Sequence, residues 1–216
     1  PFTAVFGTSD TQAFVLNCGQ ECGGAAASVV SVDFSTATAT FNPAVAPIAV
    51  PGGATVGLLN GTTLYVAGSA VTTTGPGAAC PLSRCGALTA INTTALTASP
   101  SVPITDGDHE KMAFTNNRLY IGASGCTVDP GTAANTVRGC LTIFNTGTPG
   151  TKFPEESALR QNFNVTGLQP ITGRNIIYIV QGGELDIFDT NADTLAPGVT
   201  QLDIVGKAAD VVLIDP

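Results

Sequence analysis

A strand pair that recurs along the whole chain constrains the fold more than any other feature of this sequence. In each copy an aromatic residue lies in a first strand, and a loop leads to a second strand that ends on Asp or Asn. The aromatic residues are Phe14, Tyr65, Tyr120 and Tyr178, at intervals of 51, 55 and 58 residues. This period is too long for a helical or leucine-rich repeat. It is typical of a propeller blade, a four-stranded antiparallel sheet that cannot bury its faces alone.

Two further strands are predicted around each pair. Strands are expected before the pairs at Thr3–Phe6, Thr55–Leu58, Met112–Phe114 and Leu168–Ile171, and after them at Pro47–Val50, Val102–Ile104, Phe163–Val165 and Leu202–Val205. The sequence therefore predicts an all-β fold, a β-propeller of four-stranded antiparallel blades. The four blades are expected at about 1–50, 51–105, 106–166 and 167–205, with an extra strand at 208–215.

We interpret the whole of 1–216 as one propeller segment of a longer polypeptide. A pair of stacked β-sandwiches is the alternative. Sandwich strands seldom keep a four-strand register over roughly 200 residues, which favours the propeller.

Turn residues support this strand count. Asn60-Gly61, Asn116-Asn117 and Gly173-Arg174-Asn175 fall between the first and second strands, and Asn and Gly tolerate the positive φ of tight hairpin turns. The third strands end on Asp33, Asn92, Asn145 and Asp189, whose short side chains are expected to accept a hydrogen bond from their own backbone. The recurring tyrosines are expected to lie in the core between blades.

Composition excludes several classes of function. The chain is 44% hydrophobic, with a mean hydropathy of +0.30, so it can bury a sizeable core. Its net charge of −8 makes nucleic acid an improbable partner, because an acidic surface repels phosphate backbones. No apolar run approaches the ~18–20 residues that a membrane span needs.

All six cysteines lie in the connections between the second and third strands. They form three neighbouring pairs: Cys18 and Cys22, Cys80 and Cys85, and Cys126 and Cys140. We expect each pair to close its own hairpin loop as a disulfide, because the two ends of a hairpin are neighbours across a ladder. Metal binding is the alternative, but no zinc-type spacing with histidine follows. Disulfides imply an oxidising compartment and therefore an extracytoplasmic protein, whether secreted, periplasmic or held at the cell surface.

One connection departs from the repeat. The link before the third blade carries Asp106, Asp108, His109 and Glu110, whereas the other links carry no acids. Departures from a repeat are the positions where function is most often grafted. Loops of this class emerge on the same propeller face as the cysteine loops, so Asp108, His109, Asp129 and Arg138 form our candidate binding face.

The alternating carboxylates of Asp106, Asp108 and Glu110 have a spacing that a hard cation such as Ca²⁺ can use, although the rest of an EF-hand loop is missing. His109 with a neighbouring carboxylate could serve as an acid–base pair, but sequence neighbours on a strand point to opposite faces. A solvated polar loop is the third interpretation, and it assigns no cofactor.

Three Asn residues match the N-glycosylation acceptor pattern: Asn60, Asn92 and Asn164. Asn60 and Asn92 also suit plain turn roles.

At Leu64–Ala67 and Leu119–Gly122 the chain resembles the YVTN-type propeller repeats of bacterial secreted and surface proteins. Val15–Gly24, Val137–Leu141 and Val180–Leu185 are similar to a subgroup of uncharacterised exported propellers of the acidobacterial kind. The resemblance implies a propeller fold and an exported location, and it brings no catalytic residues.

We therefore expect an exported, non-catalytic propeller that serves as a binding or structural module, including one that assembles into surface arrays or extracellular fibres. Its expected partners are further copies of itself, carbohydrate or a cell-surface protein. The alternative is a lyase or hydrolase that acts on polysaccharide through the Asp106–Glu110 loop.

Overall fold

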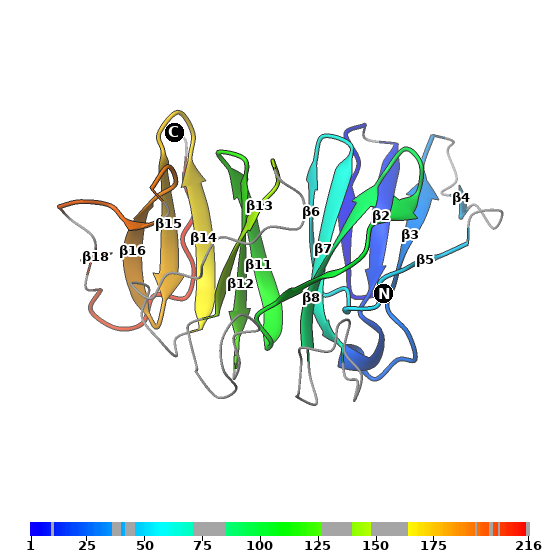
Figure 1. Ribbon diagram of the computed structural model, residues 1–216, viewed down its shortest axis with the longest axis horizontal. Coiled ribbons are helices and arrows are strands. Elements are labelled where there is room, and N and C mark those ends of the chain that lie inside the picture. The colour runs from blue at the N-terminus through cyan, green and yellow to red at the C-terminus, as the bar shows by residue number, and fades with distance from the viewer. Residues whose placement is uncertain are drawn as a thin grey trace. The chain divides into compact units, whose positions relative to one another are not determined.

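The chain forms antiparallel β-sheets in two compact units, Pro1–Ile104 and Thr105–Pro216 (Figure 1). The computed structural model describes residues 1–9, 11–35, 40–41, 46–70, 85–126, 140–147, 164–192, 194–198, 201–202 and 204–214. We refer to the two units as unit 1 and unit 2. Among the described residues, the strand pairings of each sheet lie within one unit.

Unit 1 contains two five-stranded sheets. The first sheet comprises β1 (Thr3–Phe6), β2 (Gln12–Asn17), β3 (Ser28–Asp33), β4 (Thr40–Phe41) and β5 (Ile48–Ala49), with β4 and β5 both paired to β3. The second comprises β6 (Val56–Asn60), β7 (Thr63–Ala70), β8 (Cys85–Asn92), β9 (Thr97–Ala98) and β10 (Val102–Ile104), with β9 and β10 both paired to β8. Each sheet contains the predicted four strands in antiparallel order, with one short additional strand.

Unit 2 contains two further sheets. The third sheet comprises β11 (Asp108–Thr115), β12 (Arg118–Ser124) and β13 (Leu141–Asn145). The fourth comprises β14 (Val165–Ile171), β15 (Ile176–Gln181), β16 (Glu184–Asp189), β17 (Thr194–Leu195) and β18 (Gln201–Leu202). The all-β prediction is confirmed, and these sheets are consistent with propeller-like blades.

Three predicted strands differ from the structure. Of the strand expected at Leu202–Val205, Leu202 belongs to β18, whereas Ile204 and Val205 are assigned no strand. We expected Phe163–Val165 to close the third sheet, but Val165 begins β14 of the fourth sheet and is buried against β12. Phe163 lies outside the described residues. The extra strand expected at 208–215 is also wrong over its described part, because residues 208–214 are assigned no strand.

The predicted turn chemistry is confirmed. Gly61, Asn116, Asn117 and Gly173 all have positive φ, between 51° and 73°, in the turns between first and second strands. The residues that end the third strands accept backbone hydrogen bonds two residues on: Ser35 N donates to Asp33, Thr94 N to Asn92, Gly147 N to Asn145 and Asn191 N to Asp189. The same local turn therefore follows the third strand of all four sheets.

In unit 1 the hydrophobic core lies between the two sheets. Its buried cluster comprises Phe14, Leu16, Val29, Ile48, Val50, Ala54, Leu64, Val66 and Ile91. Gly57 on β6 lies where the second sheet comes close to the first, and its lack of a side chain leaves room for this approach. A Cβ there would lie 3.0 Å from the Leu16 side chain and 3.2 Å from that of Val5. The two sheets therefore pack through their first strands.

In unit 2 the core lies between the third and fourth sheets. Tyr120 on β12 is fully buried, and its ring meets Phe188 edge-on at 5.9 Å between centroids. Beside this pair Val165 fills the space over Gly122. The tyrosine prediction holds for Tyr65 and Tyr120, which are buried, whereas Tyr178 is half-buried.

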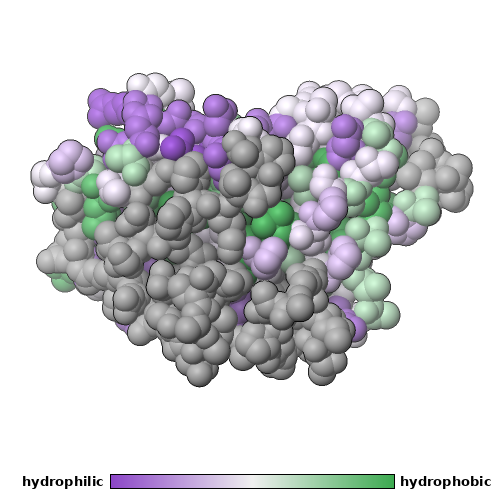
Figure 2. Space-filling model, in the orientation of Figure 1, coloured by the Kyte–Doolittle hydropathy of each residue, from purple (hydrophilic) through white to green (hydrophobic). Residues whose placement is uncertain are grey.

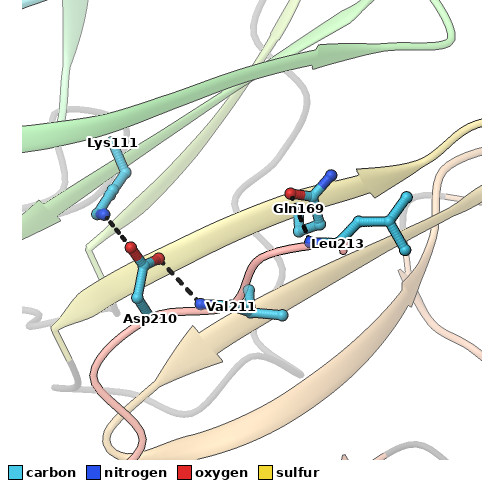
Figure 3. A network of polar contacts seen from close by, with 5 residues as sticks. All are labelled: Lys111, Gln169, Asp210, Val211 and Leu213. Carbon is cyan, nitrogen blue, oxygen red and sulfur yellow. Dashed lines mark hydrogen bonds and ion pairs between the residues drawn. The ribbon is translucent and has the colours of Figure 1, made fainter. Parts of the chain in front are cut away.

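The C-terminal segment 204–214 runs over the face of the fourth sheet. The Lys111 ammonium on β11 lies 2.8 Å from the Asp210 carboxylate, and Leu213 N donates to the Gln169 side chain (Figure 3). A Cβ on Gly167 of β14 would lie 2.8 Å from Val211 N, so the segment stacks on β14 much as β14 stacks on β12. The segment therefore lies where the first strand of a following sheet would lie, but residues 204–214 form no strand.

We expect Gly122→Ala to destabilise unit 2 by about 1–3 kcal/mol, because the new Cβ would lie 2.5 Å from a Val165 methyl carbon. Urea unfolding measures this loss. Gly147→Ala is the control, since the nearest atom lies 3.4 Å from a Cβ at that exposed position. In the Gly122→Ala background, Val165→Ala should cost less than it does alone; strict additivity would show that the two positions do not clash.

The Lys111–Asp210 ion pair should stabilise unit 2 by about 0.5 kcal/mol, a small value because both side chains are partly exposed. The hydrogen bond from Lys111 lowers the pKa of Asp210 below 3.8. The stabilisation is therefore present above about pH 4 and is lost as the pH falls through the lowered folded-state pKa.

Asp210→Asn should accordingly reduce the free energy of unfolding at pH 7 and leave it unchanged near pH 2. Lys111→Met should cause a similar loss, and the double variant no further loss. An equal effect of Asp210→Asn at both pH values would contradict the ion-pair assignment.

Candidate functional site

Two disulfides hold connections between second and third strands. Cys18 bonds Cys22 and Cys126 bonds Cys140, with Cα–Cα separations of 5.8 and 5.6 Å. The predicted pairing within one hairpin is thus confirmed for both. Cys80 and the side chain of Cys85 lie outside the described part of the chain, so their disulfide stays a prediction. The two observed disulfides indicate an extracellular or otherwise oxidising compartment.

The first cysteine loop also contacts the second sheet of unit 1. Its short 3-10 helix η1 (Gly19–Cys22) presents Glu21, whose Oε2 accepts a hydrogen bond of 2.9 Å from Ser69 N at the end of β7. A hydrogen bond to a carboxylate is stronger than one between neutral groups. Sequence reasoning did not single out Glu21, although it is the one acid inside the Cys18–Cys22 loop.

The link between the first and second sheets reaches the same place. Gly53 has φ +86° there, and a Cβ on Gly68 of β7 would lie 2.5 Å from the Gly53 carbonyl carbon. The two backbones can approach this closely because neither residue has a side chain.

These segments enclose a hollow of about 230 Å³ at one end of unit 1. Its walls are mainly apolar, from Ala25, Ala26, Ala27, Val50 and Pro51, and its polar lining includes Gln20, Glu21 and Ser69. In unit 1 the cysteine loop and the link between sheets therefore meet, as the predicted topology requires. The hollow is a rigid feature, because a disulfide, the Glu21–Ser69 hydrogen bond and the close glycine contact all fix its walls.

The acidic link of unit 2 is arranged differently from our expectation of a loop. Thr105 N donates to Thr142 Oγ1 at 3.3 Å, and Asp106 is buried at 6% exposure. From Asp108 onward the chain is strand β11, with a bulge between His109 and Lys111.

The residues at the start of this strand differ in burial. Asp108 and Glu110 are exposed, whereas His109 lies between them at 1% exposure and pairs with Ala123 of β12. His109 therefore contributes no exposed surface to the predicted binding face. The lyase or hydrolase alternative, which needs an acid–base pair among these residues, stays a prediction.

No group of three or more His, Cys, Asp or Glu side chains is placed to hold a metal ion in the part of the chain that the structure describes. Asp106, Asp108 and Glu110 belong to that part. Asp129 and Arg138, the other members of the predicted face, lie outside it.

The three predicted glycosylation positions lie at the ends or starts of strands. Asn60 is the last residue of β6, and Asn92 ends β8, where its Oδ1 accepts from Thr94 N and Ala95 N. Asn164 precedes β14, and its Oδ1 accepts from Gly125 N at 2.9 Å. Asn92 thus takes the turn role that the sequence also predicted, and glycosylation stays a prediction.

Hydrophilic side chains gather at the end of unit 2 that carries the turn between β14 and β15 (Figure 2). Asn116, Arg174 and Asn191 are exposed there, and Asn116 Nδ2 donates to Asn191 Oδ1 at 2.6 Å. These contacts join the turns of the third and fourth sheets. A search of the described residues for a helix of membrane-spanning length and hydrophobicity finds none.

No protein-family model matches the chain, and no curated protein matches it. Similar folds do occur among solved structures. The computationally designed Ika8 protein has a TM-score of 0.58 at 11% identity, over 99% of this chain and 52% of that protein. Hydrazine synthase from Kuenenia stuttgartiensis has a TM-score of 0.55 at 14% identity, over 86% of this chain and 51% of that one.

The AfRom2 CNH domain has a TM-score of 0.52 at 9% identity, over 100% of this chain and 76% of the domain. These neighbours include propeller-like proteins, and at such low identity the likeness concerns the fold alone. This chain spans about half the length of the first two.

Opening the disulfide loops should have graded effects. Loop-entropy estimates give about 2 kcal/mol for the Cys18–Cys22 loop and about 3 kcal/mol for the longer Cys126–Cys140 loop. Replacing both cysteines of one pair by Ser should lower the free energy of unfolding, as measured by urea unfolding. The loss should be larger for the Cys126–Cys140 pair than for the Cys18–Cys22 pair. Thiol titration of the denatured, unreduced protein should find no free thiol; a titre of two would show that Cys80 and Cys85 are unpaired.

Proposed function

We propose that this chain is an exported, non-catalytic structural module with propeller-type blades, which assembles with further copies of itself into arrays or fibres. The observation that carries the proposal is the position of the exposed large hydrophobic side chains. Those identified lie on the first sheet or at the end of the last one: Phe2, Phe6 and Phe34, and Leu202, Ile204, Val205, Val212, Leu213 and Ile214.

The outer face of the first sheet is apolar across three strands. Cross-strand pairing places Ala4, Val15 and Val30 in one row of this face, and Phe6 and Val32 in the next. Phe6 is 68% exposed and the three valines are half-buried. On the opposite face of the same sheet Phe14, Leu16 and Val29 are buried in the unit 1 core, so this sheet has one covered and one uncovered apolar face.

The fourth sheet has the complementary arrangement. Gln169, Tyr178 and Ile187 are cross-strand partners on the face over which the C-terminal segment runs. That segment covers the face incompletely, because Tyr178 and Ile187 stay half-buried. The segment itself exposes Val212 and Ile214 at 69% and 84%.

Comparison within the repeat supports a missing neighbour at this face. Phe14, Tyr65 and Tyr120 occupy the position equivalent to Tyr178, and all three are buried. Phe14 and Tyr120 are each covered by the sheet that follows in the same unit. The tyrosine of the last sheet differs from them in its surroundings, not in its place in the strand.

We commit to a second copy as the occupant of these faces. Within each unit, the face of one sheet that carries the repeated aromatic residue packs against the opposite face of the next sheet. The uncovered faces of the last and first sheets are of these two kinds. Two different surfaces that fit each other produce head-to-tail association. Charged residues are 11% of the chain, which lowers the desolvation cost of packing such surfaces together. Head-to-tail contacts form a ring where the rotation closes and a filament where it does not.

The test is assembly of the exported protein as it occurs, followed by light scattering over a concentration series and by electron microscopy. Phe6→Thr keeps a good strand residue and removes an exposed ring. It should weaken self-association about 10–30-fold, since burying a phenylalanine contributes about 2 kcal/mol. Thr97→Val on the exposed β9 is the control for general stickiness and should change nothing.

A protein that stays monomeric at high concentration, with no fibres on the cells, would overturn the proposal. So would a Phe6→Thr variant that assembles as strongly as the natural protein.

A further inference from the structure

A second hollow of unit 1, of about 340 Å³, is lined mainly by hydroxyl, amide and carboxylate groups. Its polar residues are Ser9, Thr11, Gln12, Ser31, Asp33 and Ser35, and the side chain of Leu96 completes it. They come from the turn between β1 and β2, from the end of β3 and from the turn between β8 and β9. The volume falls at the lower end of the roughly 300–1,000 Å³ typical of small-ligand pockets.

The polar groups of this hollow are held in fixed directions. Ser9 Oγ and Thr11 Oγ1 share a hydrogen bond of 2.9 Å, and Gln12 Nε2 donates to Ser31 Oγ at 3.0 Å. Ser35 N donates to Asp33 Oδ1 at 2.7 Å. This leaves an array of acceptors and rotatable hydroxyl donors whose positions are set before any ligand arrives, which reduces the ordering cost of binding.

Asp33 supplies an ionised acceptor in this array. The hydrogen bonds from the Ser35 backbone and side chain lower the pKa of this exposed carboxyl below 3.8. Hydroxyl groups of a ligand can donate to such a carboxylate, and hydrogen bonds to a charged group are about twice as strong as neutral ones.

The first sheet departs from the repeat at this hollow. Ser31 pairs with Phe14, and the residues that pair with the equivalent aromatic residues of the other sheets are Ala90, Ile143 and Ile187. At this position the first sheet therefore has a hydroxyl, whereas the other three sheets have an apolar side chain. The turn at Asp33 is common to all four sheets, whereas the Gln12–Ser31 pair distinguishes the first.

Leu96 gives the hollow an apolar wall. Its φ is +54°, a left-handed conformation that is uncommon for leucine and costs about 1–2 kcal/mol. The side chain also packs against the unit 1 core cluster, which holds it in place. An apolar surface beside an array of directed polar groups suits a ligand that has hydroxyls at its edge and C–H bonds on its faces.

We propose that this hollow binds a neutral polyol, such as a hexose unit of a glycan, with Asp33, Ser31 and Gln12 contacting its hydroxyls and Leu96 its C–H face. Sugars that carry carboxylate or sulfate are excluded, because the ionised Asp33 and the net charge of −8 repel them. The inference adds a ligand to the proposed module and does not depend on self-assembly, since sugar binding and association are separate measurements.

The experiment is a binding titration of the protein with glucose, galactose, mannose and their short neutral oligosaccharides. Saturation-transfer NMR detects contact and calorimetry gives the affinity. Galacturonic acid is the charged comparison and should bind at least tenfold more weakly than galactose. Both measurements are made below the concentration at which light scattering detects association.

Asp33→Asn removes the charge and keeps a side chain that forms the same turn at Asn92. We expect it to weaken binding at least tenfold. Ser31→Ala gives the first sheet the alanine that the second sheet has at the equivalent position 90, and it should also weaken binding at least tenfold. The matched control is Asp189→Asn, because Asp189 accepts from Asn191 N at 2.8 Å in the equivalent turn of the fourth sheet, outside the hollow. It should leave the affinity unchanged.

Circular dichroism and thermal unfolding establish that each variant is folded. The proposal is overturned if no neutral sugar binds at about 10 mM, or if folded Asp33→Asn and Ser31→Ala bind as well as the natural protein. It is also overturned if Asp189→Asn weakens binding as much as Asp33→Asn.

Discussion

Burial of apolar sheet faces between neighbouring sheets is the interaction on which the rest of this structure depends. A sheet of four short strands has two broad faces, and its own strands cover neither, so each face needs a neighbouring sheet. In unit 1 the side chains of Leu16 and Val5 pack over Gly57, and in unit 2 Val165 packs over Gly122. At both junctions a glycine lets the sheets approach closely enough to exclude water. The loops, disulfides and polar turns are built on the ends of this stack and need not supply the core.

Local chemistry was sufficient to predict the antiparallel hairpins and their turns from the sequence. Positive φ at Asn116 and Asn117 and the backbone hydrogen bonds to Asn92 and Asp189 depend on residues two or three positions away, so a linear pattern reveals them. The two observed disulfides were also predictable, because their cysteines are close in sequence and lie at facing ends of a hairpin.

Features that depend on neighbouring sheets were not predictable in the same way. Val165 belongs to β14 because its side chain fills the space over Gly122, a contact between residues 43 positions apart. Tyr178 resembles Tyr120 in sequence and differs from it in burial, since burial depends on what lies opposite.

The candidate sites were also not fully predictable from the sequence. The sequence indicated that the neighbours of His109 point to opposite faces, but it did not predict that His109 itself is buried, at 1% exposure. The hydroxyl-lined hollow, likewise, required the register of Ser31 and the backbone conformation of Leu96, neither of which the sequence states.

Each observed disulfide closes a loop within a single hairpin, across 4 and 14 residues of sequence. Neither of these two disulfides therefore ties one sheet to another, and each can form as soon as its own two strands have met. Residues inside such a loop can be exchanged while the two cysteines keep its ends joined, although in the first loop Glu21 also accepts a hydrogen bond from Ser69 N of the second sheet. A chain built this way can diversify its loops one at a time, with each new loop already anchored at both ends.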